Sequence, residues 1–211
     1  MFILNEAAFG DRTAENIREF VDYWSKFYTY SVSDNDTQEP ISYLHELCLG
    51  GVLDRANIRK LLRWKSPRFF TDVSAQGVRN QIVEQILERT DLFNALRKDP
   101  NQTLKFDAFV REVFRTGRAV YRAFLFHVAR PVEYPIWDQH VARVHALMRQ
   151  RLNAEDAVTD DWNQYEAYRN WFSELKGKLG INSELTSENV RGAKKLDSAL
   201  MAYGQFLKTY A

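Results

Sequence analysis

The sequence predicts an all-α protein, and three observations support this fold class. Apolar residues recur at spacings of three and four in one segment after another, which is the pattern of a helix with one buried face. No segment keeps up the alternation of apolar and polar residues that marks a half-buried strand. Residues that begin or stop helices stand between the periodic segments. The chain has 211 residues, 45% of them hydrophobic, which is enough to bury a substantial core.

Six helices are expected in the first half of the chain, over residues 13–30, 41–49, 54–65, 74–90, 91–98 and 106–114. Asp11 or Thr13 can cap the first of them, which carries a heavy aromatic face. A pair of glycines stops the second helix. Ser66-Pro67 ends the third, because a residue that precedes proline disfavours helical dihedrals.

The second half is expected to hold four more helical segments, over residues 119–129, 139–152, 162–179 and 190–210. Thr116-Gly117 interrupts the pattern before the first of these segments, and Tyr134-Pro135 precedes the second. We expect one folded unit with two lobes, a two-lobed helical bundle. A middle lobe would cover about 41–130, and residues 1–40 with 131–211 would form the other.

Composition narrows the class of protein. The net charge of +1 gives no global sign of a nucleic-acid or membrane protein. The single cysteine, Cys48, excludes an intrachain disulfide and any metal site built from four cysteines of this chain. The histidines show no spacing typical of metal ligands, so we expect no metal and no cofactor. Residues 1–9 lack the features of a signal peptide, and no apolar run approaches the roughly 18 residues of a spanning helix. We therefore expect a cytoplasmic monomer that does not enter membranes.

Positive charge is concentrated in one part of the chain. Between Arg111 and Arg151 there are eight arginines against three acidic residues, a local excess of +5 in a chain whose total is +1. Arginine makes planar, bidentate contacts with phosphate, so this cluster favours a nucleic-acid partner. The alternative for each single arginine is a place on a solvated helix face.

Asp138 stands inside this basic region, in the stretch "YPIWDQHVARVH" from Tyr134 to His145. It falls where an apolar run gives way to the expected helix over 139–152. Aspartate is among the best residues for capping a helix N-terminus, so the residue type needs no further explanation. A carboxylate at such a position can also face a cavity, and the two roles are compatible.

The segment "PIWDQHVARVHALMRQRL", Pro135 to Leu152, resembles the "VDTHVxRVxxRL" signature of the helix-hairpin-helix DNA glycosylases, and most closely the branch that contains 8-oxoguanine glycosylase. The match in register includes Asp138, His140, Val141, Arg143 and Val144. The preceding "RTGRAVYRAFLFHVARPVEYPIWD" has the length and texture of the segment that precedes this signature in the family. The specific resemblance covers residues 113–152, about a fifth of the chain.

The resemblance implies a DNA-binding enzyme that hydrolyses the N-glycosidic bond of a modified or damaged base, with Asp138 as the catalytic carboxylate. Arg115, Thr116, Gly117 and Arg118 would form the hairpin that holds the DNA backbone. Arg143 would support the site or contact phosphate, and Trp137 and Trp64 would wall the base pocket. Core packing is the alternative for each tryptophan.

The sequence departs from the family pattern in three residues: a glycine and the proline of the hairpin, and the lysine of bifunctional members. The hairpin has one glycine of the expected two and no proline. Val120 stands where bifunctional members carry the lysine that forms a Schiff base, and no lysine lies between Lys105 and Lys176. We therefore expect a monofunctional enzyme. The alternatives are a nucleic-acid-binding protein that keeps the fold without chemistry, and a helical interaction module without a nucleic-acid role.

Overall fold

A computed structural model describes residues 13–33, 41–67, 76–115, 118–150 and 160–210 of the chain. Within these ranges the regular elements are helices and there is no β-strand, so the all-α class is confirmed. Their bounds are α2 (Ala14–Trp24), η1 (Ser25–Phe27), α3 (Tyr43–Glu46), α4 (Arg55–Lys65), α6 (Gln76–Glu88), α7 (Thr90–Lys98), η3 (Pro100–Gln102), α8 (Thr103–Val113), α9 (Ala119–Ala129), α10 (Gln139–His145), η4 (Ala146–Gln150), α11 (Trp162–Lys178) and α12 (Ser187–Tyr210).

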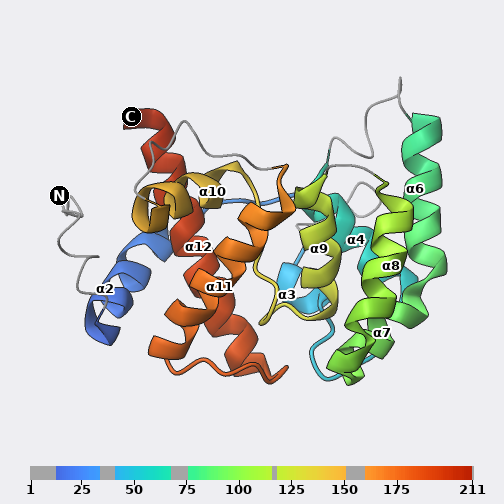
Figure 1. Ribbon diagram of the computed structural model, residues 1–211, viewed down its shortest axis with the longest axis horizontal. Helices are drawn as coiled ribbons and strands as arrows, with labels where there is room; N and C mark the ends of the chain where they lie inside the picture. The colour runs from blue at the N-terminus through green and yellow to red at the C-terminus, as the bar shows by residue number, and fades with distance from the viewer. Residues whose placement is uncertain (1–12, 34–40, 68–75, 116–117, 151–159, 211) are drawn as a thin grey trace.

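The helices form two groups that share one core (Figure 1). In this view α2, α10, α11 and α12 lie on one side, and α4, α6, α7 and α8 lie on the other. Helix α9 lies between them and contacts α4, α7 and α8 as well as α11. The buried apolar side chains form a single cluster to which both groups contribute. No described helix is both long and apolar enough to cross a membrane.

Helix N-termini follow the capping residues that the sequence offers. Thr13 Oγ1 accepts a hydrogen bond from the backbone nitrogen of Asn16, at 3.2 Å. Asp54 and Asn57 form a reciprocal capping box at the start of α4. Asp138 caps α10, and Asp161 caps α11 through the backbone nitrogen of Asn163. These helix starts are decided by residues three positions apart or fewer.

Several helix bounds differ from the sequence prediction. The helix expected over 41–49 is only Tyr43–Glu46, because the chain turns at Cys48, which has a left-handed φ of 46°. The buried Arg97 guanidinium donates to the carbonyls of Leu47 and Cys48 and replaces the helical partners of those groups. The helix expected over 139–152 ends at His145 and continues as a π-helical turn. Residues 151 and 152 lie outside the described ranges.

The loop between α9 and α10 carries the backbone toward Asp138, and side chains from three helices hold it. Four of its carbonyl oxygens each accept a hydrogen bond. Lys176 donates to the Val132 carbonyl oxygen, and His127 donates to that of Tyr134. Tyr165 donates to the Pro135 carbonyl oxygen, and Lys65 donates to that of Trp137. Because buried carbonyls in an irregular loop have no helical partners, these side chains fix the course of the loop.

His127 shows how specific this arrangement is. Its Nδ1 lies 2.6 Å from the Tyr134 carbonyl oxygen, and its Nε2 lies against the Tyr43 hydroxyl. A carbonyl can only accept, so Nδ1 carries the hydrogen and Nε2 accepts from Tyr43. Burial lowers the pKa of His127 to about 3, so the imidazole is neutral at pH 7.

Helix α10 crosses α12 at Gly204. A Cβ at this position would lie 2.2 Å from the His140 carbonyl oxygen and 2.6 Å from its carbonyl carbon. No side chain fits in this space. Gly204 thus allows the backbone of α10 to lie against α12 two residues after Asp138.

Candidate functional site: a cavity lined by carboxylates and lysine

A cavity of about 270 Å³ lies at the N-terminus of α10. Pockets for drug-sized ligands begin at about 300 Å³, so this volume suits a somewhat smaller molecule. Five separate segments contribute to it, and the lining residues are Tyr28, Tyr30, Trp64, Lys65, Val120, Tyr121, Ile136, Asp138, Gln139, His140, Asp197, Met201 and Gln205. Tyr30 and Gln139 are exposed at its rim, whereas Ile136, Asp197 and Met201 are buried.

The two oxygens of the Asp138 carboxylate have different surroundings. Oδ1 accepts from the backbone nitrogens of His140, at 2.8 Å, and Val141, at 3.2 Å, and so caps α10. No described residue donates a hydrogen bond to Oδ2. The side chain is 19% exposed and borders the cavity. Capping therefore leaves one carboxylate oxygen available to a molecule in the cavity.

Lys65 brings an amine to the same place from the end of α4. Its Nζ lies 3.9 Å from Asp138 Oδ2 and donates to the Trp137 carbonyl oxygen at 3.1 Å. The side chain is 10% exposed. Burial lowers the pKa of the Lys65 ammonium, and the negative charges of Asp138 and Asp197 oppose that shift.

Asp197 is a second carboxylate at the cavity, on the neighbouring helix α12. Its Oδ2 forms an ion pair with Lys194 Nζ at 2.7 Å. Burial raises the pKa of Asp197, and the Lys194 ammonium opposes the shift. Met201 and Gln205 follow at intervals of four residues and line the same cavity, so one face of α12 forms this wall.

Aromatic rings form another part of the wall. Trp64 packs against Tyr30 at a centroid distance of 5.3 Å and against Tyr43 at 4.7 Å, and Tyr30 donates to the Trp64 carbonyl oxygen. Trp64 therefore lines the cavity and is at the same time buried in the core, at 5% exposure. Trp137 does not line the cavity: it is 1% exposed and packs against Tyr165 and Tyr168. For Trp137 the core-packing alternative describes the structure.

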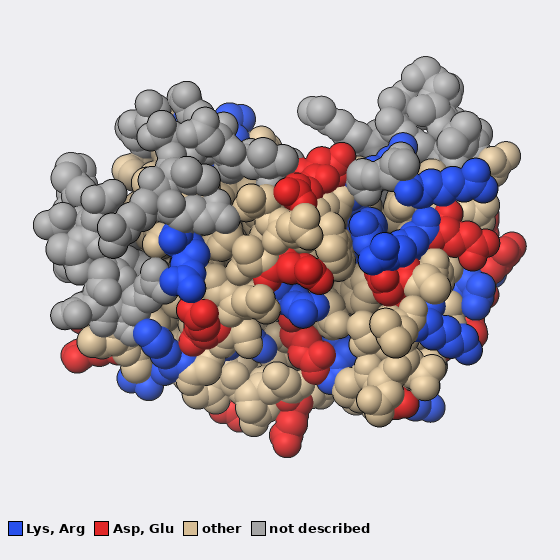
Figure 2. Space-filling view, viewed as in Figure 1, with Lys and Arg blue, Asp and Glu red and all other residues tan. Residues whose placement is uncertain are grey.

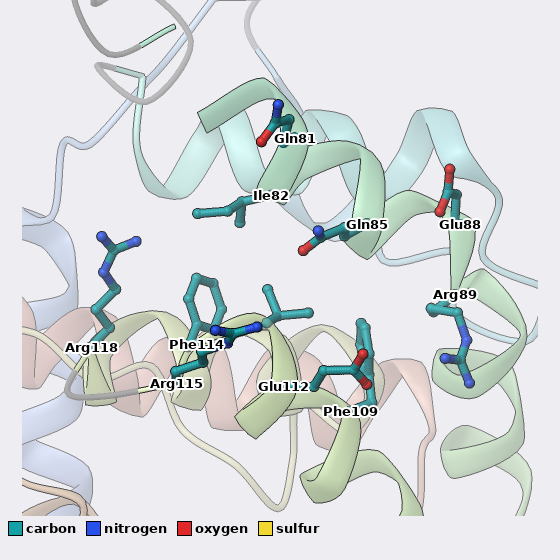
Figure 3. A pocket seen from close by; sticks show the side chains of 11 residues that line it. Gln81, Ile82, Gln85, Glu88, Arg89, Phe109, Glu112, Phe114, Arg115 and Arg118 are labelled. Carbon is teal, nitrogen blue, oxygen red and sulfur yellow. The ribbon is translucent and has the colours of Figure 1, made fainter. Parts of the chain in front are cut away.

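The predicted DNA-binding residues do not lie in this cavity. Arg115 and Arg118 are exposed and line a separate cleft of about 700 Å³ between α6 and α8. In Figure 3 they lie on the α8 and α9 side of that cleft, across from Gln81 and Gln85 of α6. Thr116 and Gly117 lie outside the described residues. Arg143 is partly buried and bonds to Gln139 and His140 on its own helix.

The charge of this cleft is mixed. Arg89, Arg115 and Arg118 line it together with Glu88 and Glu112, which leaves a net charge of +1. Figure 2 shows the same mixture on the surface over α6 and α8, where basic side chains gather with acidic ones among them. Arg118 has a left-handed φ of 59° at the start of α9, and Asp160 Oδ1 accepts from the next backbone nitrogen, that of Ala119.

Sequence reasoning missed Lys65 and Asp197. The lysine of the bifunctional family members corresponds to Val120, which does line the cavity, but the amine comes from a different helix. Lys65 follows Trp64 in the sequence "RWK", where the pattern favours the end of a helix over a contact with DNA. Asp197 lies in the predicted helix over 190–210, where no local pattern separates it from a surface carboxylate.

Among the described residues, no three histidine, cysteine or acidic side chains come together in a way that could hold a metal ion. Comparisons of the chain with protein-family models, with curated proteins and with solved structures find no match. The assignment of a function therefore depends on the residues of the cavity and on the Asp138 motif.

Proposed function

We propose that this protein is a DNA glycosylase-like hydrolase that cleaves the N-glycosidic bond of a modified or damaged base, with Asp138 as the catalytic carboxylate. The observation that carries the proposal is the arrangement of Asp138: Oδ1 caps α10, Oδ2 accepts no hydrogen bond from a described residue, and the side chain borders a base-sized cavity. An aspartate that served only as a cap would need neither the cavity nor the nearby Lys65.

The chemistry follows from the charge that the reaction develops. As the bond between C1′ of the sugar and the base nitrogen breaks, its electron pair leaves with the base and positive charge grows on the sugar. Asp138 Oδ2 would stabilise this charge and accept a proton from the water whose oxygen bonds to C1′. Lys65, at 3.9 Å, offsets the negative charge of Asp138 and holds the preceding carbonyl.

The rest of the cavity suits an extruded base. A base inside a duplex is out of reach, so an enzyme of this kind flips the nucleotide into a pocket with aromatic and apolar walls. Trp64, Tyr30 and Tyr121 supply such walls here. Arg115 and Arg118 are exposed and available for phosphate contacts outside the cavity.

The direct test is Asp138→Asn, assayed for base release from a panel of duplexes that each carry one modified base. Asparagine is also a good capping residue, so folding should be preserved. We expect the rate of base release to fall at least about 100-fold. The matched control is Asp161→Asn, which changes the cap of α11 without touching the cavity and should leave the rate unchanged.

Two outcomes would overturn the proposal. One is undiminished base release by Asp138→Asn. The other is a wild-type protein that releases no base from any duplex of the panel while it binds DNA in a salt-dependent way, which would establish the non-catalytic nucleic-acid-binding alternative.

Lys65 supports a second candidate, a combined glycosylase and lyase. An unprotonated amine in the cavity can attack C1′ in place of water, so that the base leaves with the bond's electron pair and the sugar opens to a Schiff base with the lysine. Loss of a proton from C2′ then expels the 3′ phosphate. Burial lowers the pKa of Lys65, which favours the unprotonated amine, and Asp138, at 3.9 Å, can accept the proton that the attacking amine loses.

Borohydride separates the two candidates, because it reduces a Schiff base to a stable covalent adduct. A lyase predicts a trapped protein–DNA adduct that Lys65→Gln abolishes and Lys60→Gln retains, since Lys60 pairs with Glu46 away from the cavity. Base release without any adduct or strand cleavage assigns the monofunctional reaction.

A further inference from the structure

One carboxylate oxygen of Asp197 accepts a hydrogen bond from a described residue, and the other accepts none. The side chain is only 3% exposed. Oδ2 accepts from Lys194 Nζ at 2.7 Å, whereas Oδ1 is buried and has no hydrogen-bond partner among the described residues. Buried polar atoms nearly always have a partner, and Asp197 lines the cavity, so its unpartnered Oδ1 indicates a donor that a molecule in the cavity supplies.

The position of Lys194 determines which oxygen of Asp197 receives a hydrogen bond. Its ammonium lies over three rings, 4.6 Å from the centroid of Tyr28, 5.1 Å from that of Tyr43 and 5.2 Å from that of Trp64. These cation–π contacts hold the ammonium beside Oδ2. An ammonium can only donate, and it engages Oδ2, so Oδ1 is left without a donor among the described residues.

Two donors that line the cavity are engaged elsewhere, and no described residue donates to Asp197 Oδ1. Lys65 Nζ already donates to the Trp137 carbonyl oxygen and lies beside Asp138. Tyr30 donates to the Trp64 carbonyl oxygen. Asp138 is a carboxylate and repels Asp197 electrostatically. A molecule that enters the cavity therefore meets a buried acceptor that is already in place.

We propose that Asp197 is a specificity-determining residue, whose Oδ1 accepts a hydrogen bond from an N–H group on the pairing edge of the base in the cavity. This inference rests on the proposed function in taking the ligand to be an extruded base. The amino and ring N–H groups of that edge are the donors that nucleobases offer. Guanine presents two adjacent donors, hypoxanthine and adenine present one, and unsubstituted purine presents none, so affinity should fall in that order.

A site built to bond an N–H group rejects the analogue that lacks it, because the buried acceptor is then left unpaired. The experiment measures affinity rather than base release. Duplexes carry one central guanine, hypoxanthine, adenine or purine opposite an abasic-site analogue, which makes extrusion easy. Binding is measured by fluorescence anisotropy in an Asp138→Asn background, where the base stays attached. We expect guanine to be preferred over purine by roughly 10-fold or more.

The variant Asp197→Asn makes a sharper prediction. The Lys194 ammonium will retain the amide oxygen, so the amide NH₂ takes the place of Oδ1 and an acceptor becomes a donor. The preference for guanine should disappear, and purine, which offers ring nitrogens as acceptors, should bind as well as guanine or better. The matched control is Asp22→Asn, another aspartate paired with a lysine of α12 but exposed and outside the cavity.

Thermal unfolding of each variant checks the fold. If Asp197→Asn unfolds because Lys194 is left with an uncompensated charge, the double variant Lys194→Met/Asp197→Leu removes the ion pair as a unit. It leaves no acceptor at this position, so the preference for guanine should also disappear. Folded variants that keep the wild-type order of affinities would overturn the inference. A wild-type protein that discriminates the bases but releases none would instead overturn the proposed function and leave the role of Asp197 standing.

Discussion

Gly204→Ala is the most direct test of how the fold positions Asp138. The added Cβ would lie 2.2 Å from the His140 carbonyl oxygen, whereas ordinary contacts begin at 3.4 Å. The two backbones would therefore have to separate by about 1.2 Å, the difference between these distances. The clash is with backbone atoms, so no side chain can rotate to relieve it.

The expected loss of stability follows from two opposing effects. Overpacking a tight contact costs about 1–3 kcal/mol, and backbone contacts belong at the upper end of that range. Replacing glycine by alanine inside a helix contributes about 0.5–1 kcal/mol in the other direction. We expect a net decrease of about 2 kcal/mol in the free energy of unfolding, measured by urea titration.

The same displacement should reach the site, because α10 begins immediately after Asp138. A shift of about 1 Å in a catalytic group costs on the order of 100-fold in rate. Base release should therefore fall by more than the stability loss alone explains at temperatures where the variant is folded.

The matched control is Gly177→Ala, in the exposed part of α11. A Cβ there has no neighbour within 4 Å, so this variant should gain about 0.5–1 kcal/mol from helix propensity. If Gly204→Ala were as stable as Gly177→Ala, the close crossing of α10 and α12 would not exist as described and the reasoning would be refuted.

Two further predictions concern pH and salt. Burial lowers the pKa of His145 to about 4, so the unfolded chain binds more protons between about pH 6.5 and 4, and stability should fall as pH decreases through that window. Because the buried His145 Nε2 has no partner among the described residues, His145→Phe should flatten this fall in urea titrations at several pH values, and an unchanged slope would contradict the assignment. If Arg115 and Arg118 contact phosphate, replacing both by glutamine should reduce the slope of log affinity against log salt by about two. The same change at Arg55 and Arg59, which pair with Glu84, should leave the slope as it is, and equal slopes in both double variants would exclude the cleft as the DNA contact.

Much of the local structure was predictable because it depends on neighbours in the sequence. Thr13 and Asp54 begin helices through bonds to residues three positions ahead, and the Ser66-Pro67 pair follows the end of α4. The same local physics predicted that Asp138 begins a helix. The exceptions have tertiary causes: α3 is short because Arg97, about fifty residues away along the chain, takes up the carbonyls that would extend it.

Local sequence patterns were enough to establish the helical class, the main helix starts and the aspartate at the N-terminus of α10. The surroundings of that aspartate depend on long-range packing. Lys65 reaches the cavity from α4, which precedes the motif in the sequence, and Asp197 reaches it from α12, which follows the motif. Trp137 packs into the core although it adjoins Asp138. Capping is a contact between near neighbours, whereas a cavity is formed by segments that pack together from distant parts of the chain. A motif can therefore identify the candidate carboxylate, but only packing determines which charged groups lie near it.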